Sequence, residues 1–346
     1  MSIPYFEAAD YLKHKKPAGL LLDVRSPSEY TSGHFPGAIN LPLLQDEERK
    51  EVGIAYKHKG YEAAFDLGLS FVGPKMTGFV QFVRRYKSPL PITLYCWRGG
   101  KRSASMAWLL QNAGLEVQVI SGGYKSLRKQ LLLEVEKERI LHLVSGYTGS
   151  GKTELLYRLK AKREQVVDLE GLANHKGSAF GGLGMPKQPS QEQFENLLGY
   201  SLYGLDALKP LWVEHESRMI GRLCIPDGFY RQFEKANIFL VEVPILKRIE
   251  SLVEGYADVD KALLEEAIKK IERKMGPQYC KMALEALQLD QFDQVAALTL
   301  RYYDRCYEFD LEKGGSKNIR KINCFGNMDQ AVEEMMNTNM LKKIHE

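Results

Sequence analysis

Apolar and polar positions alternate along the chain in a way that predicts two successive α/β regions. In the first, an amphipathic helix over residues 5–16 precedes apolar strands over 20–22 and 92–95 and a third strand that begins at Val117. In the second, short apolar runs separated by helical segments predict five strands, over residues 141–145, 166–170, 211–214, 238–243 and 320–323. Strands that alternate with helices are typical of parallel sheets.

The pattern also indicates how the two regions are joined. A charged segment over residues 124–140 is expected to form a linking helix, and charged helices over 261–309 are expected to extend the second region. We therefore place a first domain at residues 1–133 and a second domain at residues 134–346. With 346 residues, the chain is long enough for each domain to bury its own core.

The composition, 44% hydrophobic and 27% charged, is that of a soluble globular protein. No apolar run is long enough to span a membrane, and the first 16 residues lack the layout of a signal peptide, so we expect a cytoplasmic protein with no membrane partner. The five cysteines are widely spaced and form no CxxC pair, which argues against a disulfide framework and against a zinc site.

The formal net charge of +4 is unevenly distributed, because residues 1–135 carry 18 Lys and Arg against 12 Asp and Glu. A basic front half is compatible with a nucleic-acid partner, and it is equally compatible with a lysine-rich solvated face.

The first candidate site is the stretch CWRGGKRS. It places Cys96 between a predicted strand and a predicted helix over residues 103–112. Backbone amides, the positive end of a helix and nearby cations stabilise a thiolate, and they can hold an anionic group that is transferred to or from the sulfur. The anion-binding residues expected around Cys96 are Arg98, Gly99, Gly100, Lys101, Arg102 and Ser103.

Three segments of the first domain together resemble a rhodanese (sulfurtransferase) domain. They are LLDVRSPSEYTSGHFPGAINLP at residues 21–42, the Cys96 loop and VQVISGGY at residues 117–124. The resemblance implies that Cys96 is the catalytic cysteine. Asp23 and Arg25 are expected to form a structural ion pair, and His34 is expected to hold its turn together rather than transfer protons.

The spacing after the cysteine departs from the common sulfurtransferase loop, which places its basic residue five positions after the cysteine. Here Arg102 stands six positions after Cys96, with Lys101 in between. This Cys-x5-Arg spacing is also the pattern of Cdc25-type and tyrosine phosphatases, whose loop encloses a tetrahedral phosphate. A phosphatase would also need a general acid, which the sequence does not identify.

A second motif, GYTGSGKT at residues 146–153, lies between a predicted strand and a predicted helix and matches the G-x4-G-K-T phosphate-binding loop. Its glycines allow backbone amides to surround a phosphate chain, Lys152 neutralises phosphate oxygens, and the Thr153 hydroxyl can ligate Mg²⁺. The residues expected to bind a diphosphate are Gly146, Gly149, Gly151, Lys152 and Thr153.

Acidic residues follow the predicted strands of the second domain at Asp168, Glu170, Glu214 and Glu216. Each can order Mg²⁺ or a ribose hydroxyl, because open parallel sheets bind ligands at the carboxyl ends of their strands, or can be an ordinary exposed carboxylate. No apolar run that ends in Asp, as in a Walker B strand, is evident, which argues against an ATPase motor.

Other polar segments are weaker candidates. The glycine-rich loop at residues 173–184 contains Asn174, His175 and Lys176, together with Phe180, and suits closure over a ligand or stacking on a base; a plain surface loop fits equally well. The pair Lys247–Arg248 resembles the phosphate-contacting helix of small P-loop kinases. Residues 301–305, RYYDR, could face RNA.

The rhodanese-like domain, the P-loop domain behind it and the stretch LEGLANHKGSAFG together resemble the bacterial tRNA 2-selenouridine synthase family. The resemblance implies a two-step exchange at the wobble 2-thiouridine of tRNA. Geranyl diphosphate first alkylates the sulfur, with its diphosphate on the P-loop. Selenium from selenophosphate, carried by Cys96 as a perselenide, then replaces the thioether. Both donors are substrates, and no tightly bound cofactor is implied.

Two alternatives from other classes stay open on the residues alone. One is a P-loop small-molecule or RNA kinase that carries a regulatory rhodanese module. The other is a phosphatase that uses Cys96 and the Cys-x5-Arg loop.

Overall fold

The computed structural model describes residues 2–13, 19–87, 91–178, 180–256, 259–313, 318–324 and 327–340. The chain divides into two compact units, Met1–Val135 with Glu192–Gly204, and Glu136–Gln191 with Leu205–Glu346. The segment 192–204, which the sequence analysis placed in the second domain, therefore belongs to the first unit. The reason is that Tyr200, on helix α9 (Gln191–Leu202), and Tyr203 pack against the apolar core of the first unit.

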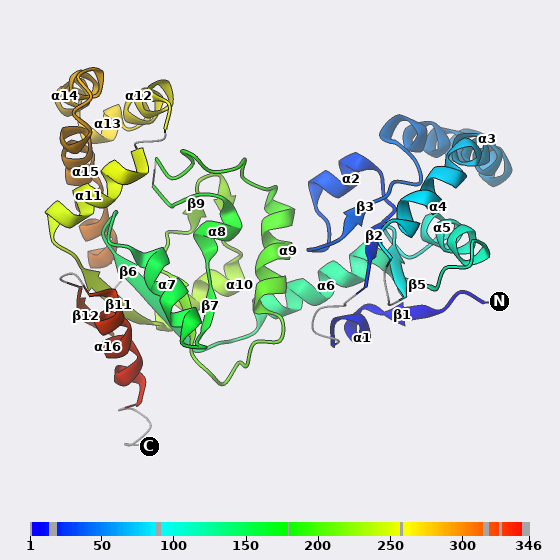
Figure 1. Ribbon diagram of the computed structural model, residues 1–346, viewed down its shortest axis with the longest axis horizontal. Helices are drawn as coiled ribbons and strands as arrows, with labels where there is room; N and C mark the ends of the chain where they lie inside the picture. Colours follow the sequence, from blue (N-terminus) through cyan, green and yellow to red (C-terminus); the bar gives the residue numbers. More distant parts are fainter. Residues whose placement is uncertain are drawn as a thin grey trace. The chain divides into compact units, whose positions relative to one another are not determined.

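The first unit is built on a five-stranded parallel sheet with the strand order β1-β5-β4-β2-β3 (Figure 1). Its strands are β1 Tyr5–Glu7, β2 Leu21–Asp23, β3 Ile39–Asn40, β4 Ile92–Tyr95 and β5 Val117–Ser121. Its helices are α1 Ala8–Lys13, α2 Pro27–Ser32, α3 Asp46–Val72, α4 Met76–Arg84, α5 Lys101–Asn112 and α6 Gly123–Glu136, with a 3₁₀ turn at Gly73–Lys75.

The two faces of this sheet bury separate apolar cores because neighbouring residues of a strand point to opposite faces. Leu22 and Leu94 belong to the core that includes residues of α4 and α5. Leu21 and Tyr95, their neighbours in sequence, belong to the core that includes residues of α1 and α6. Helices therefore cover both faces, as the α/β pattern predicts.

The structure corrects the first predicted helix. Residues 5–7 form a strand, because Tyr5 pairs with Val119 of β5, and only Ala8–Lys13 are helical. Residues 14–16, the end of the predicted helix, lie outside the described residues. The linking helix α6 ends at Glu136, four residues before the predicted end.

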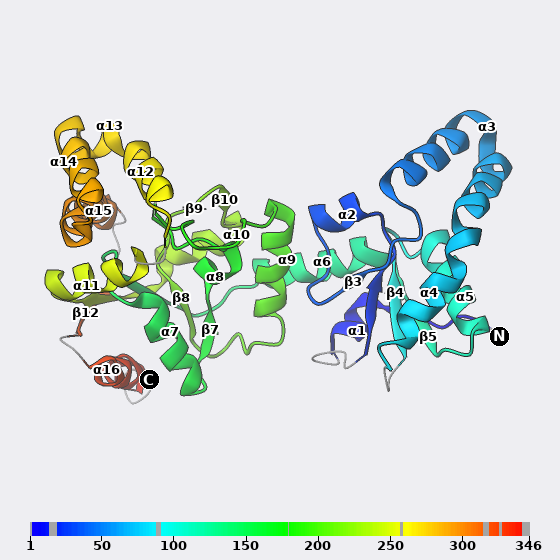
Figure 2. The ribbon, with the colours of Figure 1, turned by 45° about the horizontal axis from the view of Figure 1, so that its top comes forward.

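The long helix α3 was not anticipated. Figure 2 shows that it consists of two arms, and the bend falls at Gly60, whose φ of 88° lies outside the helical region. Ala64 is its buried residue. A weakly amphipathic segment of this kind gives the hydrophobic pattern little periodicity from which a helix could be predicted.

The second unit contains a five-stranded parallel sheet with the strand order β12-β11-β6-β8-β7. Its strands are β6 Leu141–Gly146, β7 Gln165–Val167, β8 Leu211–Glu214, β11 Asn237–Glu242 and β12 Ile319–Asn323, beside a hairpin of β9 Met219–Ile220 and β10 Leu223–Cys224. Its helices are α7 Lys152–Ala161, α8 Leu169–Ala173, α10 Asp227–Tyr230, α11 Ile245–Tyr256, α12 Lys261–Lys270, α13 Glu272–Met275, α14 Pro277–Gln288, α15 Phe292–Lys313 and α16 Met328–Met340, with a 3₁₀ turn at Arg231–Lys235.

One predicted strand of this unit is shorter than expected. β7 ends at Val167 rather than at residue 170, because Asp168 caps the short helix α8 by accepting a hydrogen bond from Gly171 N at 2.6 Å. The predicted strands over 211–214 and 320–323 correspond to β8 and β12.

Two apolar clusters stabilise the second unit. One joins the sheet to α7 and α16, with Leu156 and Val332 fully buried. The other lies among α12, α13, α14 and α15, with partly buried side chains of α11 packed against it. Figure 2 shows these helices grouped together at one end of the unit, so the predicted helical extension is confirmed.

Candidate functional sites

Cys96 follows strand β4 directly, and the loop after it leads into α5. Its side chain is buried, and Gly100 N lies 3.2 Å and Ser103 Oγ 3.3 Å from Sγ. One amide and one hydroxyl therefore converge on the sulfur.

The glycine turn that follows β5 packs against the Cys96 loop and supports it. A Cβ on Gly123, whose φ is 58°, would lie 2.2 Å from Cys96 O and 2.4 Å from Gly99 N. Tyr124 N donates to Cys96 O at 2.8 Å. Only glycine permits this close approach of two backbones, so the turn fixes the shape of the Cys96 loop.

The cations of the loop have partners of their own. Arg102 Nη1 lies 2.5 Å from Glu29 Oε2, and Lys101 Nζ lies 3.7 Å from the centre of the Tyr61 ring. Burial raises the pKa of Glu29, but the ion pair with Arg102 outweighs it and lowers that pKa below its ordinary value. Arg98 is exposed. Arg102 is therefore held beside the loop by Glu29, and the binding of an anion by Arg98, Lys101 and Arg102 stays a prediction.

Asp23, Arg25 and His34 have the structural roles that the sequence analysis gave them. Asp23 Oδ2 and Arg25 Nη2 are 2.6 Å apart and both side chains are fully buried, with the Arg25 guanidinium 3.8 Å from the centre of the Tyr124 ring. His34 Nδ1 lies 2.9 Å from Tyr30 O, and the two rings are stacked with centroids 3.8 Å apart. These residues hold the turn and the strand end in place.

The phosphate-binding motif connects β6 to α7, the context that the motif requires. Gly149 and Gly151 have φ values of 81° and 75°, which favour glycine. Lys152 Nζ donates to Gly146 O at 3.3 Å. Ser150 Oγ is buried and has no hydrogen-bond partner in the described part of the chain, so the loop contains a donor that a phosphate oxygen would satisfy.

Arg248 was expected to contact phosphate, but it holds the loop instead. Its guanidinium is buried, with Nη2 2.5 Å from Asp304 Oδ1, and Nε donates to Thr148 O at 2.9 Å. The neighbouring Lys247 pairs with Glu250 at 2.7 Å in an exposed ion pair. Arg248 therefore stabilises the P-loop backbone and is itself held by Asp304 of α15.

Carboxylates gather beside the P-loop. Thr153 Oγ1 donates to Glu170 Oε2 at 3.2 Å, and Leu169 N donates to Glu214 Oε2 at 2.8 Å. The sequence contains no evident apolar run that ends in Asp, but β8 lies next to β6 and ends in the buried Glu214. A glutamate thus stands at the strand end where an aspartate was sought. Within the described ranges, no group of three or more His, Cys, Asp or Glu side chains is arranged to hold a metal ion.

Burial shifts the pKa values of this cluster. Burial raises the pKa of Glu216 to about 8, with Glu170 adding to the rise and Lys152 opposing it, and burial also raises the pKa of Glu214 well above its ordinary value. Burial alone would lower the pKa of Lys152, but the charges of nearby acidic groups, Glu170 first among them, outweigh it and raise that pKa. Lys152 is therefore a cation suited to a phosphate, and burial favours the protonated forms of Glu214 and Glu216 beside it.

A polar chain that the sequence analysis missed borders Lys152. Ser145 Oγ lies 2.7 Å from His215 Nδ1 and also bonds the Tyr307 hydroxyl. Ser145 lies near the end of β6, and His215 directly follows the neighbouring strand β8. These positions could have indicated the contact, because parallel strands end at one edge of a sheet. Tyr307 comes from α15, and no sequence signal places it there.

His215 should make stability depend on pH. Burial and the charge of Lys152 lower the pKa of its ring from 6.5 to about 4, so protons bind the unfolded chain first as the pH falls below 6.5. Between pH 7 and pH 5, the free energy of unfolding should fall by roughly 1–2 kcal/mol more in the wild type than in His215→Gln. Urea unfolding at both pH values measures this difference.

The matched control for this experiment is His58→Gln, which removes an exposed histidine of α3. This variant should keep the pH dependence of the wild type. Equal pH dependence in the wild type and in His215→Gln would contradict the buried neutral state of His215.

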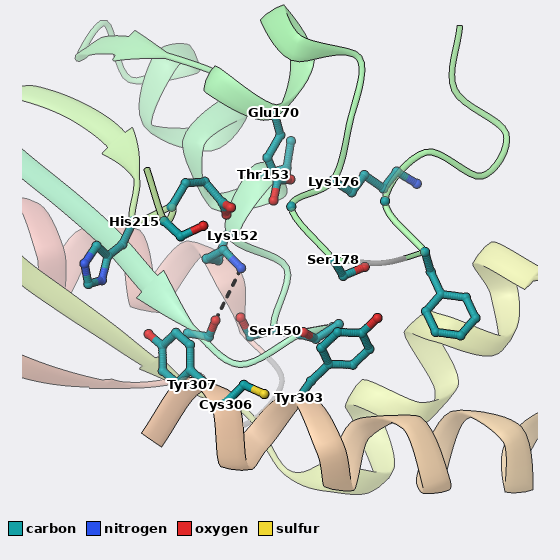
Figure 3. A pocket seen from close by; sticks show the side chains of 18 of the residues that line it. Ser150, Lys152, Thr153, Glu170, Lys176, Ser178, His215, Tyr303, Cys306 and Tyr307 are labelled. Carbon is teal, nitrogen blue, oxygen red and sulfur yellow. Dashed lines mark hydrogen bonds between the residues drawn. The ribbon is translucent and has the colours of Figure 1, made fainter. Parts of the chain in front are cut away.

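The P-loop forms one wall of a cavity of about 1620 Å³ (Figure 3). Figure 3 shows Lys152 within this wall, with Thr153 and Glu170 on one side and Tyr307 on the other. Another part of the lining is apolar and aromatic, and consists of Phe180, Leu183, Leu252, Ile271 and Tyr303. The cavity therefore combines a phosphate-binding surface with a surface suited to hydrocarbon.

The glycine-rich loop contributes to this cavity in an unexpected way. Lys176 and Phe180 both line the cavity, and Phe180 is only 7% exposed and packs edge to face against Tyr303, with ring centroids 6.2 Å apart. The Phe180 ring belongs to the core of the helical extension, so most of its surface is already packed, and stacking on a base stays a prediction. Ala179 lies outside the described residues.

Asn174 and His175 are placed by the backbone of the same loop. Asn174 has a φ of 51° and donates from Nδ2 to Lys187 O at 3.2 Å. Burial lowers the pKa of His175, and its buried Nδ1 has no hydrogen-bond partner among the described residues. Asp168 caps α8 and accepts a hydrogen bond from Tyr157 at 2.8 Å. Asn174 and Asp168 thus shape the loop and the α8 helix.

Together the two units define a class of protein in which a rhodanese-like domain with a loop cysteine is joined to a P-loop domain. A rhodanese-like domain model matches residues 7–130, and the model of the tRNA 2-selenouridine synthase AAA domain matches residues 139–343. The chain belongs to the tRNA 2-selenouridine synthase family.

Individual relatives agree with this assignment. The tRNA 2-selenouridine synthase of Shewanella sediminis is 35% identical over 87% of this chain and 90% of its own length. That of Nitrosomonas europaea is 40% identical over 68% of this chain and 63% of its own. Among solved structures, a rhodanese-related protein from Thermoplasma volcanium is similar to 36% of this chain over 91% of its own, at 22% identity and a TM-score of 0.24. In the ranges that the structure describes, no helix is both long enough and apolar enough to cross a membrane.

Proposed function

We propose that this protein converts the wobble 2-thiouridine of tRNA into 2-selenouridine in two steps. Geranyl diphosphate first alkylates the sulfur, and selenium from selenophosphate, carried by Cys96 as a perselenide, then replaces the thioether. Family membership supports tRNA selenation, and a tRNA substrate would place the reaction in the cytoplasm. The two-step reaction is supported by one observation: a phosphate-binding loop and an apolar wall line the same cavity.

In the first step, the C–O bond of geranyl diphosphate breaks and a C–S bond forms, while pyrophosphate leaves and the proton on N3 of the base is lost. Lys152 and the amides of residues 146–153 would stabilise the charge that develops on pyrophosphate. Thr153 and Glu170, whose oxygens are 3.2 Å apart, fit a Mg²⁺ ion that keeps water and phosphate ligands. When bound, that ion would supply further neutralisation of the diphosphate.

The apolar wall would hold the geranyl chain. Burial of hydrocarbon contributes about 0.8 kcal/mol per methylene group, so a ten-carbon chain gains substantially from this surface. The variant Leu252→Asn should bind geranyl diphosphate roughly tenfold more weakly and pyrophosphate as tightly as the wild type does. Isothermal titration calorimetry with the two ligands measures the difference.

The matched control for the wall is Leu246→Asn, because Leu246 lies on the same helix and is 70% exposed. Its affinity for geranyl diphosphate should equal that of the wild type. An unchanged affinity in Leu252→Asn would contradict this location of the chain.

In the second step, geranylthiol is a better leaving group than sulfide, so alkylation prepares C2 for displacement. The terminal selenium of the Cys96 perselenide attacks C2 and geranylthiol leaves. A thiol then attacks the Cys96 sulfur and forms a disulfide with it, while the S–Se bond breaks with its electron pair on selenium and 2-selenouridine is released. The amide of Gly100 and the hydroxyl of Ser103, which now contact Sγ, would stabilise the anionic forms of the loop cysteine.

The phosphorus-containing product shows how selenium is transferred from selenophosphate to Cys96. Attack of the thiolate on selenium forms an S–Se bond and breaks the Se–P bond, which leaves the electron pair on phosphorus and gives phosphite. Attack on phosphorus would instead release hydroselenide and leave a phosphorylated Cys96, whose hydrolysis gives orthophosphate. Phosphite in the ³¹P NMR spectrum is the result that the perselenide requires, and orthophosphate alone would overturn that step.

The complete reaction is tested by mass spectrometry of nucleosides after thiolated tRNA is incubated with the protein and both donors. The S-geranyl nucleoside should form with geranyl diphosphate alone, and 2-selenouridine only after selenophosphate is added. Selenouridine formed without geranyl diphosphate from tRNA that carries no geranyl group would contradict the two-step route.

A P-loop kinase is the second candidate, because the carboxylates Glu214 and Glu216 stand at and after the end of the strand next to β6. A kinase needs an acidic group near the transferred phosphate. Rapid ATP consumption that is independent of selenophosphate would favour this alternative.

A further inference from the structure

A second cavity, of about 450 Å³, lies on the helical extension of the second unit. Three cations and two tyrosines line it, Lys274, Arg301, Arg305, Tyr279 and Tyr302. It shares Lys274, Tyr302 and Cys306 with the lining of the P-loop cavity, so the two cavities adjoin. The proposed reaction gives no role to its cations.

The two arginines present their charges on one surface. Arg301 and Arg305 are four residues apart on α15 and therefore lie on the same face of that helix, and both are exposed. The Arg301 guanidinium lies 4.6 Å from the centre of the Tyr279 ring, which orients it. Lys274, on α13, is also exposed.

Among the residues that the structure describes, these three cations have no acidic partner. Within the described part of the chain, no carboxylate forms an ion pair with Lys274, Arg301 or Arg305, and no acidic residue lines the second cavity. The nearby Asp304 is already paired with Arg248. The surface thus carries a local positive charge that no ion pair among the described residues neutralises.

We propose that this second cavity binds the phosphate backbone of the substrate RNA next to the nucleotide that enters the P-loop cavity. Arg301, Arg305 and Lys274 contact phosphates, and Tyr302 offers a flat surface for a flanking base. RNA fits this surface better than an isolated anion does. Its phosphates pair with the cations and its flat bases stack on the tyrosines, so both kinds of side chain have a partner. This inference rests on the proposed function only in taking RNA as the substrate.

The test is the affinity for thiolated tRNA, measured by fluorescence anisotropy at several salt concentrations. The double variant Arg301→Ala/Arg305→Ala should bind tRNA at least tenfold more weakly than the wild type. The slope of log K against log salt concentration should become less steep by about two, one for each lost phosphate contact. Pyrophosphate binding to the P-loop should be unchanged, which also shows that the variant is folded.

The matched control is Arg273→Ala/Lys281→Ala, which removes the same charge from exposed positions of the same extension that do not line the cavity. It should bind tRNA nearly as well as the wild type. Equal weakening in both double variants, or no weakening in Arg301→Ala/Arg305→Ala, would overturn the site. Competition by polyglutamate as strong as that by RNA of equal charge would also overturn it, in favour of an acidic protein partner.

The outcome separates this inference from the proposed function. A wild-type protein that does not bind thiolated tRNA contradicts the proposed function itself. Wild-type binding that the arginine variants leave intact contradicts only the assignment of this cavity. Should the alanine double variant fail to bind pyrophosphate, Arg301→Gln and Arg305→Gln, tested singly, keep the side-chain volume and should each lose about one unit of salt slope.

Discussion

Cys96→Ser should abolish the formation of 2-selenouridine while leaving S-geranylation intact, so that geranylated tRNA accumulates. The selenation rate should fall by roughly 10³-fold or more, because a serine hydroxyl cannot carry selenium in place of the thiolate. The geranylation rate should stay within about twofold of wild type, since the residues proposed for that step belong to the other unit. Nucleoside mass spectrometry of time courses with each donor measures both rates.

The control for Cys96→Ser is Cys224→Ser, because Cys224 is another free cysteine and lies on the β10 strand of the hairpin. That variant should retain both activities. If Cys96→Ser still forms 2-selenouridine from purified geranylated tRNA, the perselenide role is wrong. An aryl phosphatase activity that depends on Cys96 would instead support the Cys-x5-Arg phosphatase alternative.

Lys152→Ala should have the opposite effect on the two steps. Geranylation should fall by about 10²–10³-fold, because the variant removes a charged donor that stabilises the departing pyrophosphate in a buried setting. Selenation of tRNA that already carries the geranyl group should continue at a rate close to that of the wild type. Single-turnover assays with each tRNA substrate distinguish the two effects.

The control for this variant is Lys160→Ala, an exposed lysine on the same helix α7 that does not line the cavity. Lys160→Ala should keep the wild-type geranylation rate. A Lys152→Ala protein that loses selenation of geranylated tRNA to the same extent as geranylation would contradict the separation of the two steps. Such a result would favour a mechanism in which both geranylation and selenation take place at the P-loop.

The local motifs were predictable because each depends on residues that are close in sequence. The P-loop needs its glycines and Lys152 within eight positions, and the flanking strand and helix follow from local hydrophobic periodicity. The loop at Cys96 and the glycine turn at Gly122–Gly123 were recognisable for the same reason. Their close approach, in which a Cβ added to Gly123 would lie 2.2 Å from Cys96 O, required the pairing of β4 with β5.

The partners of the charged side chains were not predictable. Arg102 pairs with Glu29, and Arg248 with Asp304, across 73 and 56 positions of the chain. A sequence shows that an arginine stands near a cysteine or a phosphate loop, but it does not show which carboxylate competes for that arginine. Each arginine therefore has a carboxylate partner that its place in the sequence did not reveal.

The sequence by itself determined the two α/β domains, the loop cysteine and the phosphate-binding loop, because hydrophobic period and glycine positions are local properties. The tertiary structure alone decided that α9 belongs to the first unit, that Phe180 is buried, and that Tyr302, Tyr303 and Tyr307 of α15 reach the P-loop cavity. Such contacts arise when helices distant in sequence bury their apolar faces together. Burial depends on the whole packed arrangement rather than on any one segment.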